Sequence, residues 1–177
     1  MTAPQIRSET VDWDIWYPDA YEISAEGVRG FARAVRDPHV PFGARGILAT
    51  DTPVPITLLA GPMFDAAAIL VSRAIPNCNL SRIVHAAQQF TTVRPLRIGQ
   101  RISFGARLTS HIVKANTDVI AIEVTAYADD AAHLAALITI AHSATAGPGV
   151  DLDAVADQIM LTGTGPSDSD AYTATAG

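Results

Sequence analysis

The sequence is poor in several features that would each indicate a particular class of protein. It has one cysteine, Cys78, so it can form neither an internal disulfide framework nor a cysteine-rich zinc site. Its longest apolar run, 66–71, has six residues and is too short to span a bilayer, and its first ten residues lack the apolar core of a signal sequence. We therefore expect a soluble, cytoplasmic protein that does not enter a membrane.

Positive charge is also scarce. The 177 residues include 12 Lys and Arg against 18 Asp and Glu, a formal charge of −6. This balance argues against a nucleic-acid or anionic-membrane partner, since both need a basic surface. Charged residues make up 17% of the chain, below the roughly 25% that is usual for soluble domains. We expect another subunit to cover part of the surface.

What the chain does contain is a clear helix signal near its start. Ser24 is a favourable N-cap residue, and apolar side chains follow it at i, i+3, i+4 and i+7 as far as Val35. Pro38 ends the pattern, because the residue before a proline avoids the helical region. These signals predict a helix over 24–37.

A second helix is predicted over 61–74, where Pro62 suits the first turn. This segment is apolar on nearly every side, which is typical of a helix buried at the centre of a domain. The preceding stretch, 38–62, holds five prolines and three glycines. It predicts a long loop, and loops of that length are usually functional.

In the second half of the chain the hydrophobic period changes from 3.6 to 2. Residues 102–109 and 120–127 alternate between apolar and polar, and 134–141 is apolar on both faces, so we expect half-buried strands and one interior strand. Turns are predicted at 116–118 and 129–130. A curved antiparallel sheet around one buried helix is the hot-dog architecture, and a generic α+β sandwich is the alternative.

The stretch 80–99, LSRIVHAAQQFTTVRPLRIG, carries a more specific motif. Its elements are His85, Gln88, Phe90, Arg94-Pro95 and Gly99. In this it resembles the MaoC-like (R)-hydratase/dehydratase hot-dog family, in particular the HadA- and HadC-type noncatalytic subunits of (3R)-hydroxyacyl-ACP dehydratases. The resemblance extends over about 17–146 and implies a single α+β hot-dog fold, an acyl-ACP or acyl-CoA thioester as ligand, and no cofactor.

One departure from that family bears on catalysis. Its active members carry Asp-x-Asn-Pro-(aliphatic)-His, and aligning Asp37 with the Asp puts Phe42 where the His belongs. Phenylalanine has no titratable group and cannot move a proton. The resemblance therefore implies a noncatalytic, acyl-thioester-binding subunit, in a homodimer or in a heterodimer with a catalytic MaoC-like subunit. Gln100, where the family has Asp in a turn, is a second departure.

The residues that we expect to contact substrate come from the first helix, the long loop and the motif. They are Phe31, Val40, Phe42, His85, Gln88 and Arg94. His85 and Gln88 are three apart on a predicted strand, which places them on opposite faces. For His85 a hydrogen-bonded structural role is the alternative. For Arg94 it is a solvated charge or a contact with a partner.

Three residues are candidates for catalysis, each with a structural alternative. Asp37 and His39 are either a rearranged acid/base pair or a helix-terminating Asp and a loop His. Asp65 is either an acid in the first turn of its helix, a partner contact, or the catalytic carboxylate of a hot-dog thioesterase. No metal site is predicted, and three further histidines are interpreted as structural: His111, His133 and His142.

We divide the chain into a loosely ordered N-terminus, 1–16, a MaoC-like hot-dog domain, 17–148, and a C-terminal tail, 149–177, with a short helix followed by disorder. Two alternatives to the dehydratase subunit remain open. One is an acyl-CoA thioesterase that uses Asp65, and the other is an acyl-binding or structural hot-dog protein without catalysis.

Overall fold

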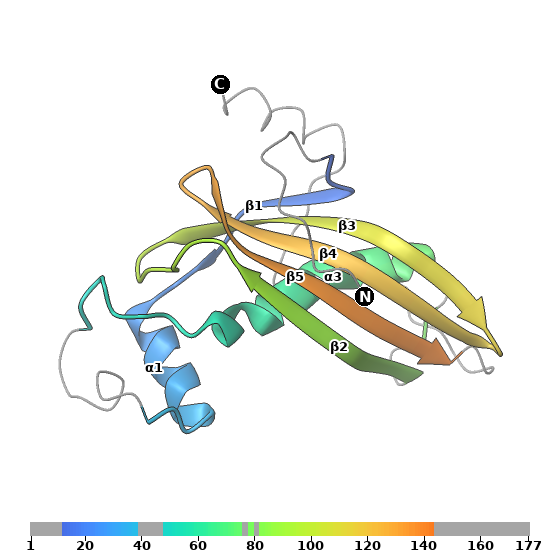
Figure 1. The fold of residues 1–177 in the computed structure, drawn as a ribbon, viewed down its shortest axis with the longest axis horizontal. Helices are drawn as coiled ribbons and strands as arrows, with labels where there is room; N and C mark the ends of the chain where they lie inside the picture. Colours follow the sequence, from blue (N-terminus) through green and yellow to red (C-terminus); the bar gives the residue numbers. More distant parts are fainter. Residues whose placement is uncertain (1–11, 39–47, 76–77, 80–81, 144–177) are drawn as a thin grey trace.

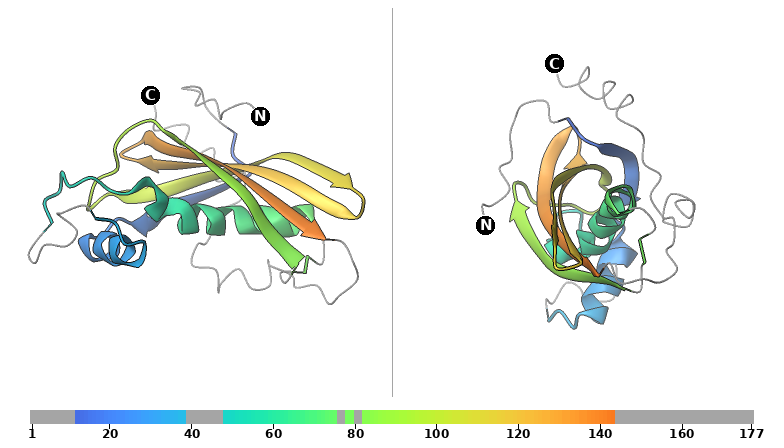
Figure 2. Two further views of the ribbon diagram at one scale, coloured as in Figure 1. Left: turned by 60° about the horizontal axis from the view of Figure 1, so that its bottom comes forward. Right: turned by 90° about the vertical axis from the view of Figure 1, so that its right-hand side faces the viewer.

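The structure is a computed structural model that describes residues 12–38, 48–75, 78–79 and 82–143. Its elements, in chain order, are β1 (Ile15–Glu22), α1 (Ala25–Ala34), the 3-10 helix η1 (Ile56–Leu59), α3 (Ala60–Ala74), β2 (Ile83–Thr92), β3 (Arg101–Lys114), β4 (Thr117–Ala128) and β5 (Ala131–Ser143). The five strands form one antiparallel sheet in the order β1-β3-β4-β5-β2. The sheet curves around α3 (Figures 1 and 2), which confirms the predicted hot-dog fold.

Helix α1 begins where the sequence predicts. The Ser24 side chain accepts a hydrogen bond from the Gly27 N–H at 3.0 Å, as an N-cap does. The helix ends three residues earlier than predicted, because Val35 is the C-cap and Arg36 takes a left-handed conformation with φ of +57°.

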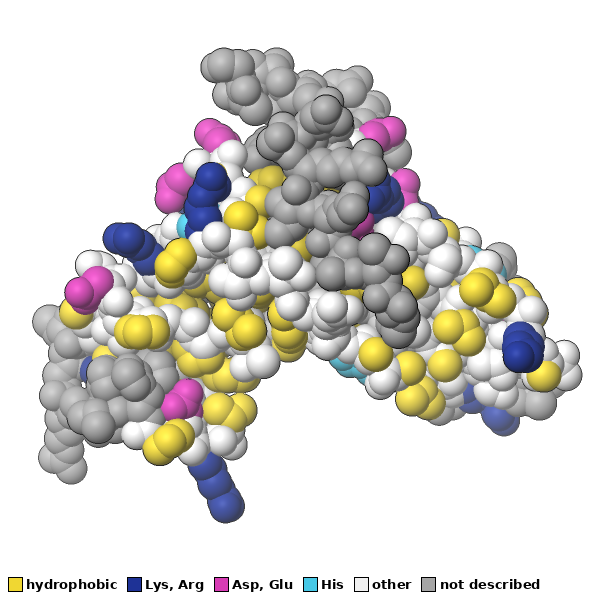
Figure 3. Space-filling model, in the orientation of Figure 1, with side chains coloured by type: hydrophobic (Ala, Val, Ile, Leu, Met, Phe, Trp, Pro, Cys, Tyr) yellow, Lys and Arg dark blue, Asp and Glu magenta, His cyan; other side chains and the backbone are white. Residues whose placement is uncertain are grey.

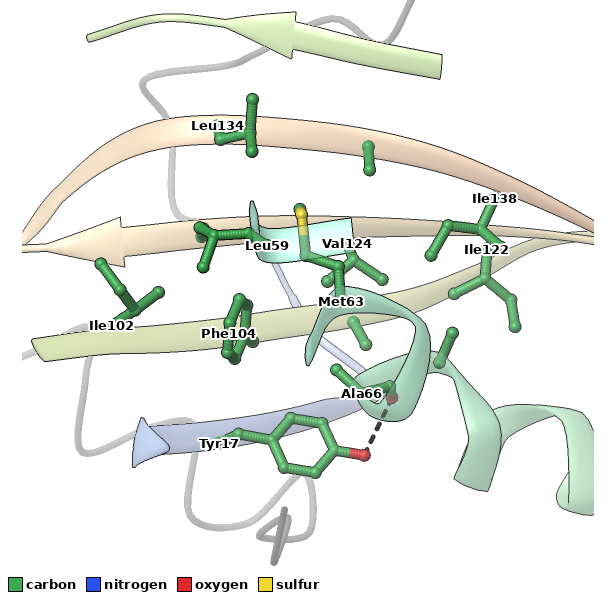
Figure 4. Close-up of a cluster of buried hydrophobic side chains, with 14 of the residues drawn as sticks. Tyr17, Leu59, Met63, Ala66, Ile102, Phe104, Ile122, Val124, Leu134 and Ile138 are labelled. Carbon is green, nitrogen blue, oxygen red and sulfur yellow. Dashed lines mark hydrogen bonds between the residues drawn. The ribbon is translucent and has the colours of Figure 1, made fainter. Parts of the chain in front are cut away.

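Helix α3 is the buried centre of the domain, as predicted, and packs chiefly on β3 and β4. Small side chains at Ala66 and Ala67 let it approach the sheet closely, and Met63 fills the space beside them. The Tyr17 hydroxyl of β1 donates a hydrogen bond of 2.9 Å to the Ala66 carbonyl (Figure 4). Because that bond is buried, it fixes the position of α3 across the sheet.

The end of the predicted long loop is helical, since η1 leads directly into α3. Together they make a 19-residue helical segment, Ile56–Ala74, which is long and apolar enough to cross a membrane by length and composition alone. The sequence analysis, which considered only uninterrupted apolar runs, did not predict such a segment. Core helices pass the same test, and α3 lies against the sheet as a core helix does (Figure 2).

Two-residue turns join the last three strands. Asp129 and Asp130 both have positive φ, as the predicted turn requires. The turn before β4 lies at Ala115 and Asn116, one residue earlier than predicted, with φ of +48° and +60°. This shift changes which residues of β3 and β4 face each other.

Candidate functional site

Strand β2, which carries the sequence motif, contains a β-bulge. His85 pairs with Ile140 of β5 and Gln88 pairs with Ile138, and the register shifts just after His85. Both isoleucines point into the core, so their two partners lie on that same side of the sheet. The prediction that His85 and Gln88 face opposite sides is therefore wrong, because Ala86 is an extra residue in the strand.

The bulge brings His85 to the central helix. Its imidazole ring lies 4.8 Å from the ring of Phe64 of α3, centroid to centroid, with 37° between the ring planes. Phe64 is itself half-buried against the core. This ring contact joins α3 to an edge strand that it otherwise barely touches.

Gln88 presents an unusual polar group on the same side of β2. Its Nε2 atom is buried and has no hydrogen-bond partner among the described residues. A buried amide donor without an acceptor costs about 1–3 kcal/mol. Such groups are rare in native proteins, and they are often found where a ligand supplies the missing partner.

Asp65 follows Phe64 on α3 and is the only catalytic candidate on this helix. It is the sixth residue of α3, beyond the first turn, so the reading as an N-terminal acid is wrong. Burial raises the pKa of its carboxyl group above the ordinary value. The structure gives it no hydrogen bond or ion pair within the described part of the chain.

The remaining candidates are spread more widely. Phe31 packs on the core from α1, and the backbone N–H of Asp37 donates to the Ala32 carbonyl at 2.8 Å, just past that helix. Arg94 is exposed after β2, where its Nη1 lies 3.5 Å from the Ala132 carbonyl oxygen. The loop candidates lie outside the described residues: His39, Val40 and Phe42.

A polar network that the sequence analysis missed lies at the other end of the sheet. Asp118 of β4 accepts from His111 Nε2 of β3 at 2.7 Å and contacts His142 Nδ1 of β5 at 3.4 Å. Burial by itself would raise the pKa of Asp118, but the hydrogen bonds and charge interactions with the two histidines outweigh it and lower the pKa. His133 is also paired, because its Nδ1 donates to the Pro95 carbonyl at 3.0 Å.

The missed signal was the turn. With Ala115 and Asn116 as the two turn residues, Asp118 pairs with Val113 and lies on the same face as His111. A turn placed at 116–118 hides that relation. Across the described ranges no group of three or more His, Cys, Asp or Glu side chains has the arrangement of a metal site.

A polar groove of about 630 Å³ opens between the β2–β3 connection and the β4–β5 turn. Its lining includes Asp19, Arg97, Gln100, Arg101 and Asp129. Gln100 holds the turn before β3, because its Oε1 accepts from the Arg97 N–H at 2.7 Å. Its Nε2 lies 3.4 Å from an Asp129 carboxylate oxygen, so the groove's polar groups already serve one another.

Comparison with known proteins agrees with this architecture. Residues 10–136 match the family model described as the FAS1-like, dehydratase domain region. Similar curated proteins include a UPF0336 protein of Streptomyces avermitilis, 31% identical over 70% of this chain and 86% of the relative. Another is a UPF0336 protein of Cutibacterium acnes, 32% identical over 67% and 81%.

Solved structures share the fold at lower identity. The C-terminally truncated HadBC (3R-hydroxyacyl-ACP dehydratase) complex from Mycobacterium tuberculosis aligns with a TM-score of 0.57, at 19% identity over 75% of this chain and 99% of that one. A MaoC-like dehydratase aligns with a TM-score of 0.60, at 19% identity over 76% and 43%. The fold thus defines a MaoC-like hot-dog protein. By its family match, the chain belongs to the FAS1-like dehydratase region family.

Proposed function

We propose that this chain is an acyl-thioester-binding, noncatalytic subunit of a (3R)-hydroxyacyl-ACP or -CoA dehydratase. The observation that carries the proposal is the buried, unpartnered Nε2 of Gln88. It lies on the α3 side of β2, the side on which His85 contacts Phe64. A mostly apolar surface with one or two directed donors is the usual means of orienting a small-molecule carbonyl.

The proton-transfer step is assigned to a partner. In the sequence, Phe42 stands five residues after Asp37, where the resembled hydratase motif has its histidine. Dehydration needs a group that removes a proton and a group that protonates the leaving hydroxyl. We assign both groups to a second hot-dog subunit with an intact motif, and we take the assembly to be cytoplasmic.

Strand β2 is where that subunit would attach. It forms one edge of the sheet and pairs only with β5 among the described strands. Long uncovered edges are uncommon because they present unpaired backbone groups. Val84 of β2 is 60% exposed, and Figure 3 shows apolar side chains on the surface of this part of the sheet. Pairing of β2 with the edge of another hot-dog subunit would cover both features.

Asp65 supports one alternative, an acyl-CoA thioesterase. A carboxylate whose pKa is raised by burial is a stronger base than an ordinary Asp and can activate water. The Asp65→Asn variant distinguishes the two functions. Loss of thioester hydrolysis in a folded variant supports the thioesterase, and an unchanged absence of hydrolysis supports the binding subunit.

The experiment that tests the proposal combines activity with ligand protection. The purified chain is mixed with trans-2-enoyl-CoA of C4 to C16, and both the enoyl absorbance and the melting temperature are followed. The proposal expects no hydration and a raised melting temperature. Gln88→Leu should abolish the protection, whereas Gln89→Leu, at the neighbouring exposed position, should retain it. Hydration by the chain alone, or equal protection of both variants, contradicts the proposal.

A further inference from the structure

The histidine at the end of β5 uses both of its ring nitrogens. His142 is buried, with 6% of its side chain exposed. Its Nδ1 lies 3.4 Å from Asp118 Oδ2, and its Nε2 lies 3.2 Å from the backbone nitrogen of Asn79. Asn79 and Cys78 belong to the connection between α3 and β2. One side chain of the sheet therefore holds the connection that leads into the motif strand.

These contacts fix the protonation state of His142. A backbone N–H can only donate, so Nε2 of His142 must accept from Asn79 and carry no proton. The ring proton is then on Nδ1, where it faces the Asp118 carboxylate. We propose that neutral His142 is a pH-sensitive latch that holds the connection at Cys78 and Asn79 against the sheet, and that protonation of His142 releases it.

A proton added to His142 has only Nε2 to occupy. The imidazolium then has N–H groups at both nitrogens, and one of them faces the N–H of Asn79. The hydrogen bond is lost and two donors oppose each other in a buried position, which is unfavourable. The Asp118 carboxylate favours the added proton, so acidification drives His142 away from the latched state.

The second histidine on Asp118 responds differently. His111 contacts Asp118 through Nε2 at 2.7 Å, and it is more exposed, at 29% of its side chain. Protonation of its other nitrogen leaves the Nε2–H bond to Asp118 in place. The two histidines share one carboxylate, yet only His142 loses a contact when it gains a proton.

The other groups around His142 do not titrate in the same range. Asp118 stays ionised, because its histidine contacts lower its pKa. Cys78 stays a neutral thiol, because burial and the Asp118 charge raise its pKa. The residue opposite His142 on β2 is Ile83, which is apolar. Between pH 5.5 and 7.5 the imidazoles are the groups that change charge.

The chain contains its own reporter of the released state. Cys78 is the only cysteine, is 1% exposed, and directly precedes Asn79. Its reaction rate with 4,4′-dithiodipyridine, divided by the rate for the urea-unfolded chain at the same pH, measures how often the connection opens. If the latched state excludes the proton, this ratio should rise about tenfold from pH 7.5 to 5.5, as expected for one imidazole of ordinary pKa.

Two variants of the full chain locate the effect. In His142→Gln the amide oxygen can still accept from Asn79 but does not titrate, so the ratio should stay flat. In His111→Gln the rise should persist. A flat ratio in the wild-type chain, or the same rise in His142→Gln, overturns the proposal.

A measurement on the wild-type chain serves if His142→Gln does not fold. The ¹⁵N shifts of the imidazoles should show His142 as the Nδ1–H form at pH 7.5, and the Asn79 amide resonance should move as His142 titrates. A doubly protonated His142 at pH 7.5, or an Asn79 resonance that is unaffected by its titration, contradicts the latch. Because none of these readouts involves a thioester, the result is independent of the proposed function.

Discussion

Two polar regions lie on the concave side of the sheet, and the chain satisfies them to very different degrees. Near α3 and β2, the Gln88 amide is buried without an acceptor, and the Asp65 carboxyl has no partner among the described residues. At the far end, Asp118 contacts both His111 and His142, and His142 also accepts from Asn79.

The difference separates a binding surface from a structural one. Buried polar groups in folded proteins are normally hydrogen-bonded, and the exceptions usually have a functional reason. The network around Asp118 meets that rule with its own residues, so it contributes to stability. The α3–β2 face does not, so removal of its polar groups should cost the fold little or even stabilise it.

The largest effect is expected for Asp118→Ala. This change leaves the His111 and His142 nitrogens without their acceptor, in a region that is largely buried. We expect the free energy of unfolding at pH 7, measured with urea, to fall by about 2–3 kcal/mol. Asp51→Ala, at an exposed turn residue, is the control and should change it by less than about 0.5 kcal/mol. Equal effects of the two changes would remove the contrast between the regions.

A smaller effect of opposite sign is expected for Gln88→Leu. Leucine has a similar size and no donor to leave unpaired, so the free energy of unfolding should rise by about 1 kcal/mol. Gln89→Leu, on the exposed neighbour, should change it by less than about 0.5 kcal/mol. A clear destabilisation by Gln88→Leu would mean that the amide has a structural bond, and the two regions would then be alike.

The fold could be predicted from the sequence because its main signals are local. The Ser24 cap and its apolar stripe predict α1, and the uniformly apolar segment predicts the central α3. The period-2 alternation predicts β3 and β4. Each signal acts within one element, so the order of elements and the hot-dog architecture follow from composition and spacing.

The geometry of the site could not be predicted in the same way. The motif identified His85 and Gln88, but their common face depends on one extra residue at Ala86, and a bulge has no reliable sequence signature. Similarly, Ala115 takes a positive φ that alanine rarely adopts, so propensity placed the turn one residue late and hid the relation of Asp118 to His111. A shift of one residue moves side chains to the other face of a strand.

The smallest expected effect concerns the two aspartates, whose pH dependences should differ in sign. Burial raises the pKa of Asp65 above its ordinary value of 3.8, so its ionised form is disfavoured in the folded state. That cost is fully present above the folded pKa and disappears as the pH falls towards 3.8. Asp65→Asn should therefore stabilise the protein at pH 7 by a few tenths of a kcal/mol, roughly, since the side chain is partly exposed.

The opposite holds for Asp118, whose pKa is lowered in the folded state. Its stabilising effect is present above the ordinary pKa and is lost as the pH falls through the lowered one. Urea unfolding of Asp65→Asn and Asp118→Asn from pH 7 to pH 3 compares the two. The gain in Asp65→Asn and the loss in Asp118→Asn should both shrink towards acid pH, each from its own side of zero. If the two variants differ from wild type in the same direction at pH 7, the carboxylates do equivalent work and Asp65 has a partner in the folded chain.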